Sequence, residues 1–186
     1  MEQERFAELD EASLSDAQRR VRADILAGPR GGMRGPFKAL LRCPGLFETA
    51  QKLGAYVRFR SSLPRALNEM AILLTARHWT AQFEWHAHHA LALQAGLPPE
   101  VAAAIAEGRR PDGMSAEVAA VHDFVHALLA TGAVPDAGFA AVRDRFGEAG
   151  VVDLIGAVGY YSLVSMVLNV DRLAVPGGEL PLRPLP

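Results

Sequence analysis

Residues 63–96 read LPRALNEMAILLTARHWTAQFEWHAHHALALQAG and contain two apolar patterns of helical period. In the first, residues 64–77, apolar side chains recur at the three- and four-residue spacing of one helix face. The second begins at about Gln82 and closes at Gly96, a residue that suits the position just after a helix C-terminus. A short connecting segment near Thr80 separates the two patterns. The sequence therefore predicts two antiparallel helices packed side by side.

Three chemically reactive side chains lie within this pair of helices. Glu84 and His88 are four residues apart, so they share one face of the second helix. Glu69 lies in the apolar run of the first helix, where a buried carboxylate needs a partner or a raised pKa. With the hairpin closed, Glu69 can face the other two. His88 is the general acid–base candidate, because imidazole titrates near neutral pH.

A structural interpretation of the same residues stays open. Glu69 can pair with an arginine such as Arg60 or Arg65, and Glu84 with His88 can be an ordinary helix pair. We favour the functional interpretation, because carboxylates with perturbed pKa values cluster in functional sites.

The remaining histidines of interest form two close pairs. His86 and His89 are three residues apart, and His122 and His126 share an i, i+4 face of a later helix, with Asp123 beside them. A metal site needs a third ligand at a recognisable spacing, and neither pair has one. We therefore predict no metal and no cofactor. The sequence assigns no role to these four histidines, and we interpret the later pair as solvated or interfacial.

Composition narrows the class of protein. The chain has 186 residues, half of them hydrophobic, with few β-branched runs, which favours a single all-α domain over residues 1–186. A net charge of −2 does not favour electrostatic binding of nucleic acid. The single cysteine, Cys43, excludes an intramolecular disulfide, and the acidic start of the chain has no apolar signal core. We expect a cytoplasmic protein.

Start and stop signals divide the rest of the chain into helices within a core of about residues 13–170. After an N-terminal helix or arm of residues 1–12, Ser15 and Gln18 match a capping box. The expected helices cover residues 15–27, 37–42, 44–59, 97–108, 115–130, 135–146 and 150–169. The proline-rich tail, residues 176–186, is predicted to be extended.

The longest apolar run is 151–168, which has roughly the length of a membrane span. Asp153 lies inside it, together with two glycines, two tyrosines and two serines. We interpret the run as a buried helix of a bundle or a subunit interface. An apolar helix of this length in one small domain also predicts an oligomer.

The pattern E-x(14)-E-W-x-x-H-x-x-x-A-x-x-A-G resembles the carboxymuconolactone decarboxylase and alkylhydroperoxidase D-like family. It is formed by Glu69, Glu84, Trp85, His88, Ala92, Ala95 and Gly96. The flanking segments agree, so that the resemblance covers roughly residues 13–169. It implies an all-α fold whose protomers associate through the central helices into dimers, trimers or hexamers.

The resemblance separates two branches of that family. In the peroxidase branch a Cys-x-x-Cys pair reduces the peroxide, and its two positions fall here at Ala81 and Glu84. A carboxylate cannot form the disulfide intermediate, so the peroxidase mechanism is not expected. The decarboxylase branch lacks the thiols and uses acid–base chemistry on an acidic lactone. This sequence is closer to that branch.

We therefore expect a lyase that acts on a small organic acid or lactone, with Glu69, Glu84 and His88 as catalytic residues. Arg30, Arg34 and Arg42 lie in or near a Gly/Pro-rich loop, and the first two are the substrate-binding candidates, since guanidinium groups bind carboxylates in a bidentate manner. A solvated loop or an intersubunit contact is the alternative for these arginines. The alternative functions are an alkylhydroperoxidase-like antioxidant protein and a non-catalytic helical oligomer that binds a small ligand or a protein partner.

Overall fold

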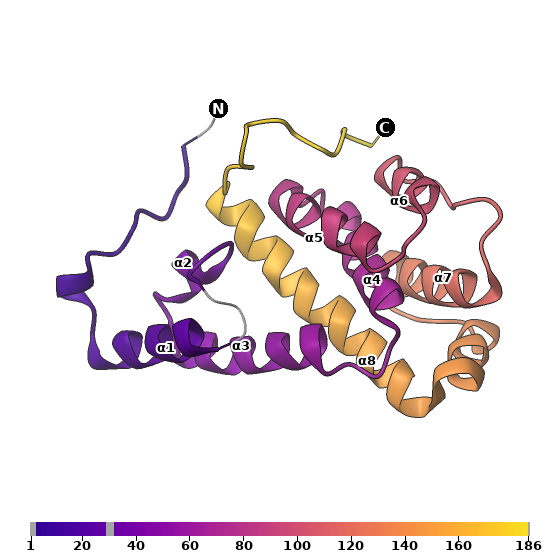
Figure 1. Ribbon diagram of the computed structural model, residues 1–186, viewed down its shortest axis with the longest axis horizontal. Coiled ribbons are helices and arrows are strands. Elements are labelled where there is room, and N and C mark those ends of the chain that lie inside the picture. The colour runs from indigo at the N-terminus through magenta and orange to yellow at the C-terminus, as the bar shows by residue number, and fades with distance from the viewer. Residues whose placement is uncertain (1–2, 29–31, 186) are drawn as a thin grey trace.

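The computed structural model describes residues 3–28 and 32–185. Within those residues the secondary structure is entirely helical, which confirms the all-α class (Figure 1). The elements are η1 (Glu11–Ser13), α1 (Asp16–Ala27), α2 (Phe37–Leu40), α3 (Pro44–Phe59), α4 (Arg65–His78), α5 (Gln82–Gln94), α6 (Pro99–Ala106), α7 (Ala116–Thr131) and α8 (Asp136–Asp171).

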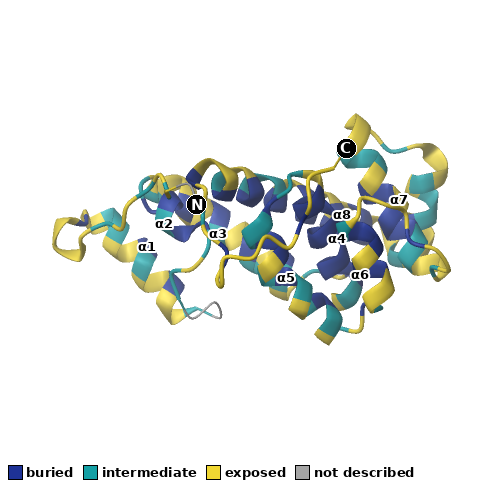
Figure 2. Cartoon of the chain, turned by 90° about the horizontal axis from the view of Figure 1, so that it is seen from above, coloured by how far each residue is buried: buried dark blue, intermediate teal, exposed yellow. Residues whose placement is uncertain are grey.

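Helix α4 is the centre of the molecule. All eleven residues from Leu67 to Arg77 are buried, because α4 packs against α5, α6, α7 and α8. Figure 2 shows buried residues gathered where these helices meet. A separate apolar cluster around Phe37 and Phe47 joins α1, α2 and α3. The apolar pattern of residues 64–77 therefore underestimates the burial of this helix, since polar residues of α4 are buried as well.

The capping and glycine signals in the sequence predicted most helix ends correctly. The Ser15 hydroxyl accepts from the Gln18 amide, and the Gln18 side chain accepts from the Ser15 amide, as a capping box requires. Gly96 and Gly132 have positive φ values of 98° and 74°, a conformation that glycine adopts without strain at a helix C-terminus. The helix expected at residues 37–42 ends at Leu40.

The last two expected helices meet at a kink. The sequence predicts helices over residues 135–146 and 150–169, and in the structure two helices meet at the non-helical residue Gly147 within the continuous element Asp136–Asp171. Gly147 has φ 70° and ψ 177°, which glycine tolerates, and helical hydrogen bonding resumes directly after it. Glycine therefore bends the chain here without opening a loop.

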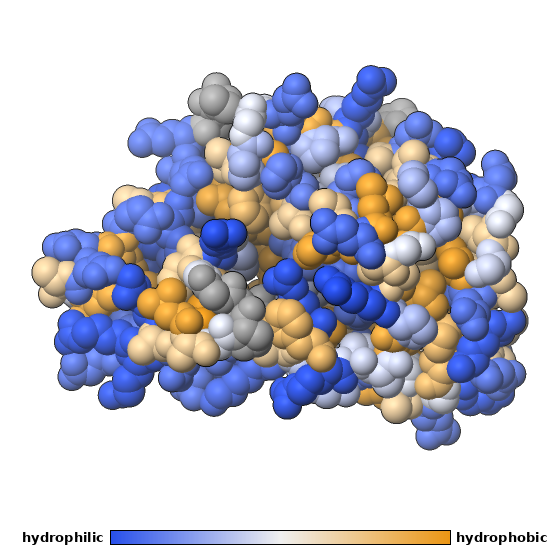
Figure 3. Space-filling model, in the orientation of Figure 1, coloured by the Kyte–Doolittle hydropathy of each residue, from blue (hydrophilic) through white to orange (hydrophobic). Residues whose placement is uncertain are grey.

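Helix α8 is long and apolar enough to cross a membrane by those two criteria alone, yet 56% of its most apolar window is buried inside this chain. It runs through the middle of the molecule and packs against α3, α4 and α7 (Figure 1). On the face seen in Figure 3, hydrophobic side chains lie in scattered groups between hydrophilic ones. These features are those of a core helix.

We expect the protein to form a homo-oligomer, because α3 and α8 still expose large apolar side chains. These are Leu46, Leu53, Phe59, Val152, Ile155, Met166 and Val170, each at least 40% exposed. Sedimentation equilibrium at micromolar concentration should therefore give a mass of at least twice the 20.0 kDa of one chain. A stable monomer would contradict the expectation. A matched variant, Ile155→Glu, should shift the equilibrium toward the monomer, because it places a charge on the apolar face.

Asp153, the acidic residue of the apolar run, fixes α8 to α3 and to the segment between α3 and α4. Its carboxylate accepts from the Tyr56 hydroxyl at 2.8 Å, the Ser62 amide at 2.6 Å and the Ser62 hydroxyl at 2.7 Å. Burial favours the neutral acid, but these hydrogen bonds outweigh it and lower the pKa of Asp153. The carboxylate has a structural role.

Asp153→Asn should therefore lower the free energy of unfolding by about 2 kcal/mol, the usual value for hydrogen bonds to a charged group. Because the folded pKa is lowered, this stabilisation is present above the unfolded pKa of about 3.9 and is lost as the pH falls through the folded value. Urea denaturation at pH 7 measures the difference. Asp144→Asn, at an exposed position of the same helix, is the control and should change stability by less than about 0.5 kcal/mol.

Candidate active site

The turn between α4 and α5 brings their faces together. Thr80 adopts a left-handed conformation with φ 47°, unusual for a β-branched residue, and its amide bonds to the Arg77 carbonyl at 3.0 Å. The Ala81 amide bonds to the Ala76 carbonyl at 2.8 Å. This closed turn directs α5 back along α4, as the sequence predicted, and the two helices are in extensive contact.

The predicted residues Glu69, Glu84 and His88 meet between the two helices. His88 Nδ1 lies 2.7 Å from Glu69 Oε2, and His88 Nε2 lies 3.0 Å from Glu84 Oε1. Exposure is 2% for Glu69 and 4% for each of the others. The arginine partners considered for Glu69, Arg60 and Arg65, are not its partners in this structure. Both ring nitrogens of His88 are thus engaged by carboxylates.

This arrangement makes His88 a cation at neutral pH. Burial disfavours the charge, but the Glu84 carboxylate and the hydrogen bonds to Glu69 and Glu84 outweigh it and raise the pKa of His88 to about 9. As an imidazolium, the ring donates one N–H to each carboxylate. The three groups form a continuous proton chain, in which the imidazolium is the shared donor and one carboxylate accepts on each side of it.

Tyr161 of α8 covers the imidazole. Its ring lies edge-to-face on His88, with a centroid distance of 5.0 Å. Burial, and to a smaller extent the negative charge of Glu84, raise the pKa of Tyr161 well above its ordinary value. The phenol therefore stays neutral and available as a hydrogen-bond donor. The sequence alone favoured a backbone or subunit-interface hydrogen bond for Tyr161, with a cavity-lining role as the alternative.

A cavity of about 460 Å³ opens beside this group. Glu84, His88 and Tyr161 line it, whereas Glu69 lies on the other side of His88 and is not among its lining residues. Two cationic side chains, Arg34 and Arg58, also line it. Among the three predicted catalytic residues, Glu84 is therefore the carboxylate that a bound molecule would meet.

The three arginines of the Gly/Pro-rich region do not lie together at this cavity. Arg34 is exposed and lines the cavity, while Arg30 lies outside the residues that the structure describes. Arg42 is directed elsewhere: it donates to the Lys38 carbonyl at 2.8 Å and the Ala7 carbonyl at 2.6 Å. Arg42 therefore does not line the cavity, because the N-terminal arm and α2 engage its guanidinium.

Arg58 is the cavity residue that sequence reasoning missed. It lies near the C-terminus of α3, its side chain is half-buried, and its charge opposes the rise in the pKa of Tyr161. The only local signal was a cation in the last turn of a helix, a common feature at that position. The packing of α3 against α8 is what brings it to the cavity.

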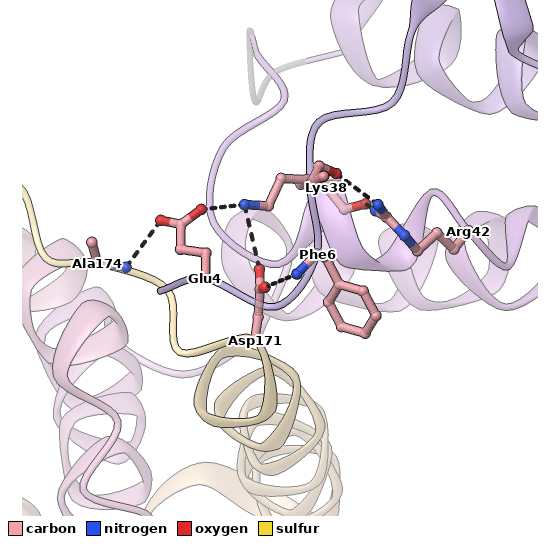
Figure 4. A network of polar contacts seen from close by, with 7 residues as sticks. Glu4, Phe6, Lys38, Arg42, Asp171 and Ala174 are labelled. Carbon is pink, nitrogen blue, oxygen red and sulfur yellow. Dashed lines mark hydrogen bonds and ion pairs between the residues drawn. The ribbon is translucent and has the colours of Figure 1, made fainter. Parts of the chain in front are cut away.

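A polar network holds the wall of the cavity that α2 provides. The Lys38 ammonium pairs with Glu4 and lies 3.7 Å from Asp171, whose carboxylate accepts from the Phe6 amide at 2.8 Å (Figure 4). The Ala174 amide bonds to Glu4 at 3.2 Å. The network ties the N-terminal arm, α2 and the end of α8 together.

The other histidines do not join the three central residues. His86 lines the cavity, and His89 stacks on Trp85 with ring centroids 5.8 Å apart. His122 and His126 stack on each other in a different part of the molecule. Over residues 3–28 and 32–185 no three His, Cys, Asp or Glu side chains are arranged so that they could hold a metal ion.

Sequence comparisons do not assign this chain to a family. No family model matches this sequence. A multifunctional CCA protein of Halorhodospira halophila is 33% identical over 122 residues, which are 66% of this chain and 26% of that protein. The chain thus spans about a quarter of the length of the curated relative it matches.

Two solved structures have the same architecture. One is the alkylhydroperoxidase AhpD core of an uncharacterised peroxidase-related protein from Ralstonia eutropha, with a TM-score of 0.70 and 18% identity, covering 91% of this chain and 90% of that chain. The other, from Agrobacterium tumefaciens, is a protein of unknown function described as a candidate antioxidant defence protein AhpD. Its TM-score is 0.61 at 19% identity, covering 77% of this chain and 99% of that chain. At these identities the likeness shows the fold alone: the chain has the AhpD-like all-α fold, as the resemblance implied.

Proposed function

We propose that this AhpD-like chain is a thiol-less acid–base enzyme of the carboxymuconolactone decarboxylase type, which acts on a small organic acid or lactone. The observation that carries the proposal is the buried chain Glu69–His88–Glu84, which ends at a cavity with Arg34 and Arg58 in its wall. Such a cavity, lined by apolar groups and a few convergent polar ones, is the usual form of a small-molecule site.

The proton chain supports one order of events. Both His88 nitrogens are bound to carboxylates, so a proton that reaches the substrate passes through Glu84. Loss of CO₂ from a carboxylate leaves the bonding electron pair on the substrate, delocalised toward the lactone carbonyl. His88 passes its Nε2 proton to Glu84, Glu84 delivers that proton to the carbon, and Glu69 accepts from the Nδ1–H of the ring, which is now neutral. Solvent restores the lost proton.

The arginines and the tyrosine fit this chemistry. The Arg58 guanidinium can bind the substrate carboxylate in a bidentate manner, and Arg34 adds a second positive charge at the rim. Tyr161 is a neutral phenol beside His88 and can donate to a lactone oxygen as negative charge develops there. Each group acts in a protonation state that the structure favours at neutral pH.

The experiment is to incubate the purified protein with carboxymuconolactone and related unsaturated lactone acids, and to measure CO₂ release. We expect turnover of at least one acid and none of the corresponding methyl ester, which lacks the carboxylate that leaves. Binding of the acids without any release of CO₂ would instead favour the non-catalytic, ligand-binding oligomer.

We expect no thiol-dependent peroxidase activity. The peroxidase names belong to the structural neighbours, whereas this chain has Ala81 and Glu84 at the two thiol positions and a single cysteine, Cys43. Cys43 is exposed next to the start of α3, and it is not among the residues that line the cavity. A coupled assay with hydroperoxide and a dithiol reductant should give the same background rate for the wild type and Cys43→Ala. Rapid turnover that Cys43→Ala abolishes would overturn this expectation.

A further inference from the structure

A second cavity, of about 360 Å³, lies between the C-terminal ends of α4 and α6, helix α7 and the C-terminal tail. It has no lining residue in common with the cavity beside His88. Its apolar walls come from Leu74, Ile105, Leu129 and Leu185. The tail is firmly placed, because Leu182 exchanges two hydrogen bonds with the Gln82 side chain, at 2.8 and 2.9 Å.

Arg77 lines this cavity and is the least compensated cation among the buried residues of the described chain. It is 4% exposed, and no carboxylate of the described residues lies within ion-pair distance. Its guanidinium donates to the carbonyls of Ala106 and Arg183 and to the Thr80 hydroxyl, and its Nε has no partner. Burial lowers the pKa of Arg77. Carbonyl dipoles solvate the charge in part, but they do not neutralise it.

His122 is the second buried group in the wall. Its Nδ1 lies 2.8 Å from Asp123, and Arg110 holds that carboxylate by two hydrogen bonds of 2.8 and 2.9 Å. Asp123 therefore orients the ring and leaves Nε2 as the nitrogen available to a ligand. His126 stacks on His122 with centroids 6.0 Å apart. His78 lies on the opposite wall, on α4.

We propose that this cavity binds a small amphipathic organic anion, with its charged head between Arg77 and His122 and its apolar body against the leucine and isoleucine side chains. Charge supports an anion: of the three arginines that line the cavity, Arg110 pairs with Asp123 and Arg109 pairs with Glu107, which leaves the buried Arg77 without a carboxylate partner. The apolar walls support a ligand with a hydrocarbon chain or ring in addition to the head. The inference does not depend on the function proposed for the His88 cavity.

The test is calorimetric titration of the wild-type protein with octanoate, with octanamide and with inorganic phosphate. Octanoate should bind saturably, whereas octanamide lacks the charge and phosphate lacks the apolar body, so both should bind at least about tenfold more weakly. Equal binding of octanoate and octanamide, or no binding of octanoate at millimolar concentration, would refute the proposal.

Variants locate the bound probe. Arg77→Met should weaken octanoate binding by about tenfold or more, and His122→Phe, which keeps a ring in the same place, gives a second reading if Arg77→Met does not fold. Arg143→Ala, at an exposed position on α8, is the matched control and should bind like the wild type. Arg58→Ala should also bind normally. Binding that Arg58→Ala removes and that Arg77→Met and His122→Phe retain would place octanoate in the first cavity and contradict the proposal.

Acidification should strengthen binding. Burial lowers the pKa of His78 and His122, and a bound anion stabilises their protonated forms, so affinity should rise from pH 8 to pH 6. The other charged or titratable groups facing the cavity are Arg77, Arg109, Arg110, Asp123 and His126. The imidazole NMR signals of His122 should move on addition of octanoate while those of His88 stay in place. The reverse pattern would sink the assignment.

Discussion

Glu84→Gln is expected to lower the turnover number for the lactone acid by about a hundredfold or more, the usual contribution of general acid–base catalysis. The amide cannot carry a proton between His88 and the substrate, although it keeps the size and one acceptor oxygen of the carboxylate. The Michaelis constant should change much less, because Arg58 and Arg34 remain to bind the substrate anion. Initial rates of CO₂ release over a range of substrate concentrations separate the two parameters.

Glu69→Gln is the matched control for this variant. It makes the same chemical change on the other side of His88, at a position that does not line the cavity. We expect it to lower turnover less than Glu84→Gln, because it alters the charge around His88 but leaves the last step of the chain intact. Near-wild-type turnover in Glu84→Gln, or a larger loss in Glu69→Gln, would show that the proton takes a different path.

His88→Gln is expected to destabilise the fold at pH 7 by on the order of 3–5 kcal/mol, the typical effect of removing one member of a buried ion pair. The substitution removes the cation between Glu69 and Glu84 and leaves two buried carboxylates without it. From the sequence alone we would have expected this variant to fold normally. Urea denaturation compares it with His89→Gln, on the same helix but outside the carboxylate pair, which should change stability by about 1 kcal/mol or less.

The pH dependence gives an independent reading of the same group. The folded pKa of His88 is raised from 6.5 to about 9, so the protonated form is favoured by the folded state. Its stabilisation is complete below about pH 6.5 and is lost as the pH rises through 9. The wild type should therefore lose stability between pH 6.5 and 9, and His88→Gln should lose much less over that range. Parallel curves for the two proteins would contradict a protonated His88.

Local sequence rules predicted much of the secondary structure of this protein. Helical periodicity with capping residues such as Ser15 and Gly132 located the helices to within one or two residues at most ends. The spacing of Glu84 and His88 set them on one face of α5, and the tight turn at Thr80 required α4 to run alongside. These features depend on interactions between residues that are close together in the chain, and such interactions can be predicted from the sequence.

Tertiary packing decided the remaining features of the site. Helical period fixes the direction of a side chain relative to its own helix, but not which face of a neighbouring helix it meets. Only the packed structure therefore brings Arg58 to the cavity and turns Arg42 away from it. It also sets Glu84 at the cavity, with Glu69 on the far side of His88. Likewise, the partners of Asp153 lie more than 90 positions away in the chain, beyond the reach of any local rule.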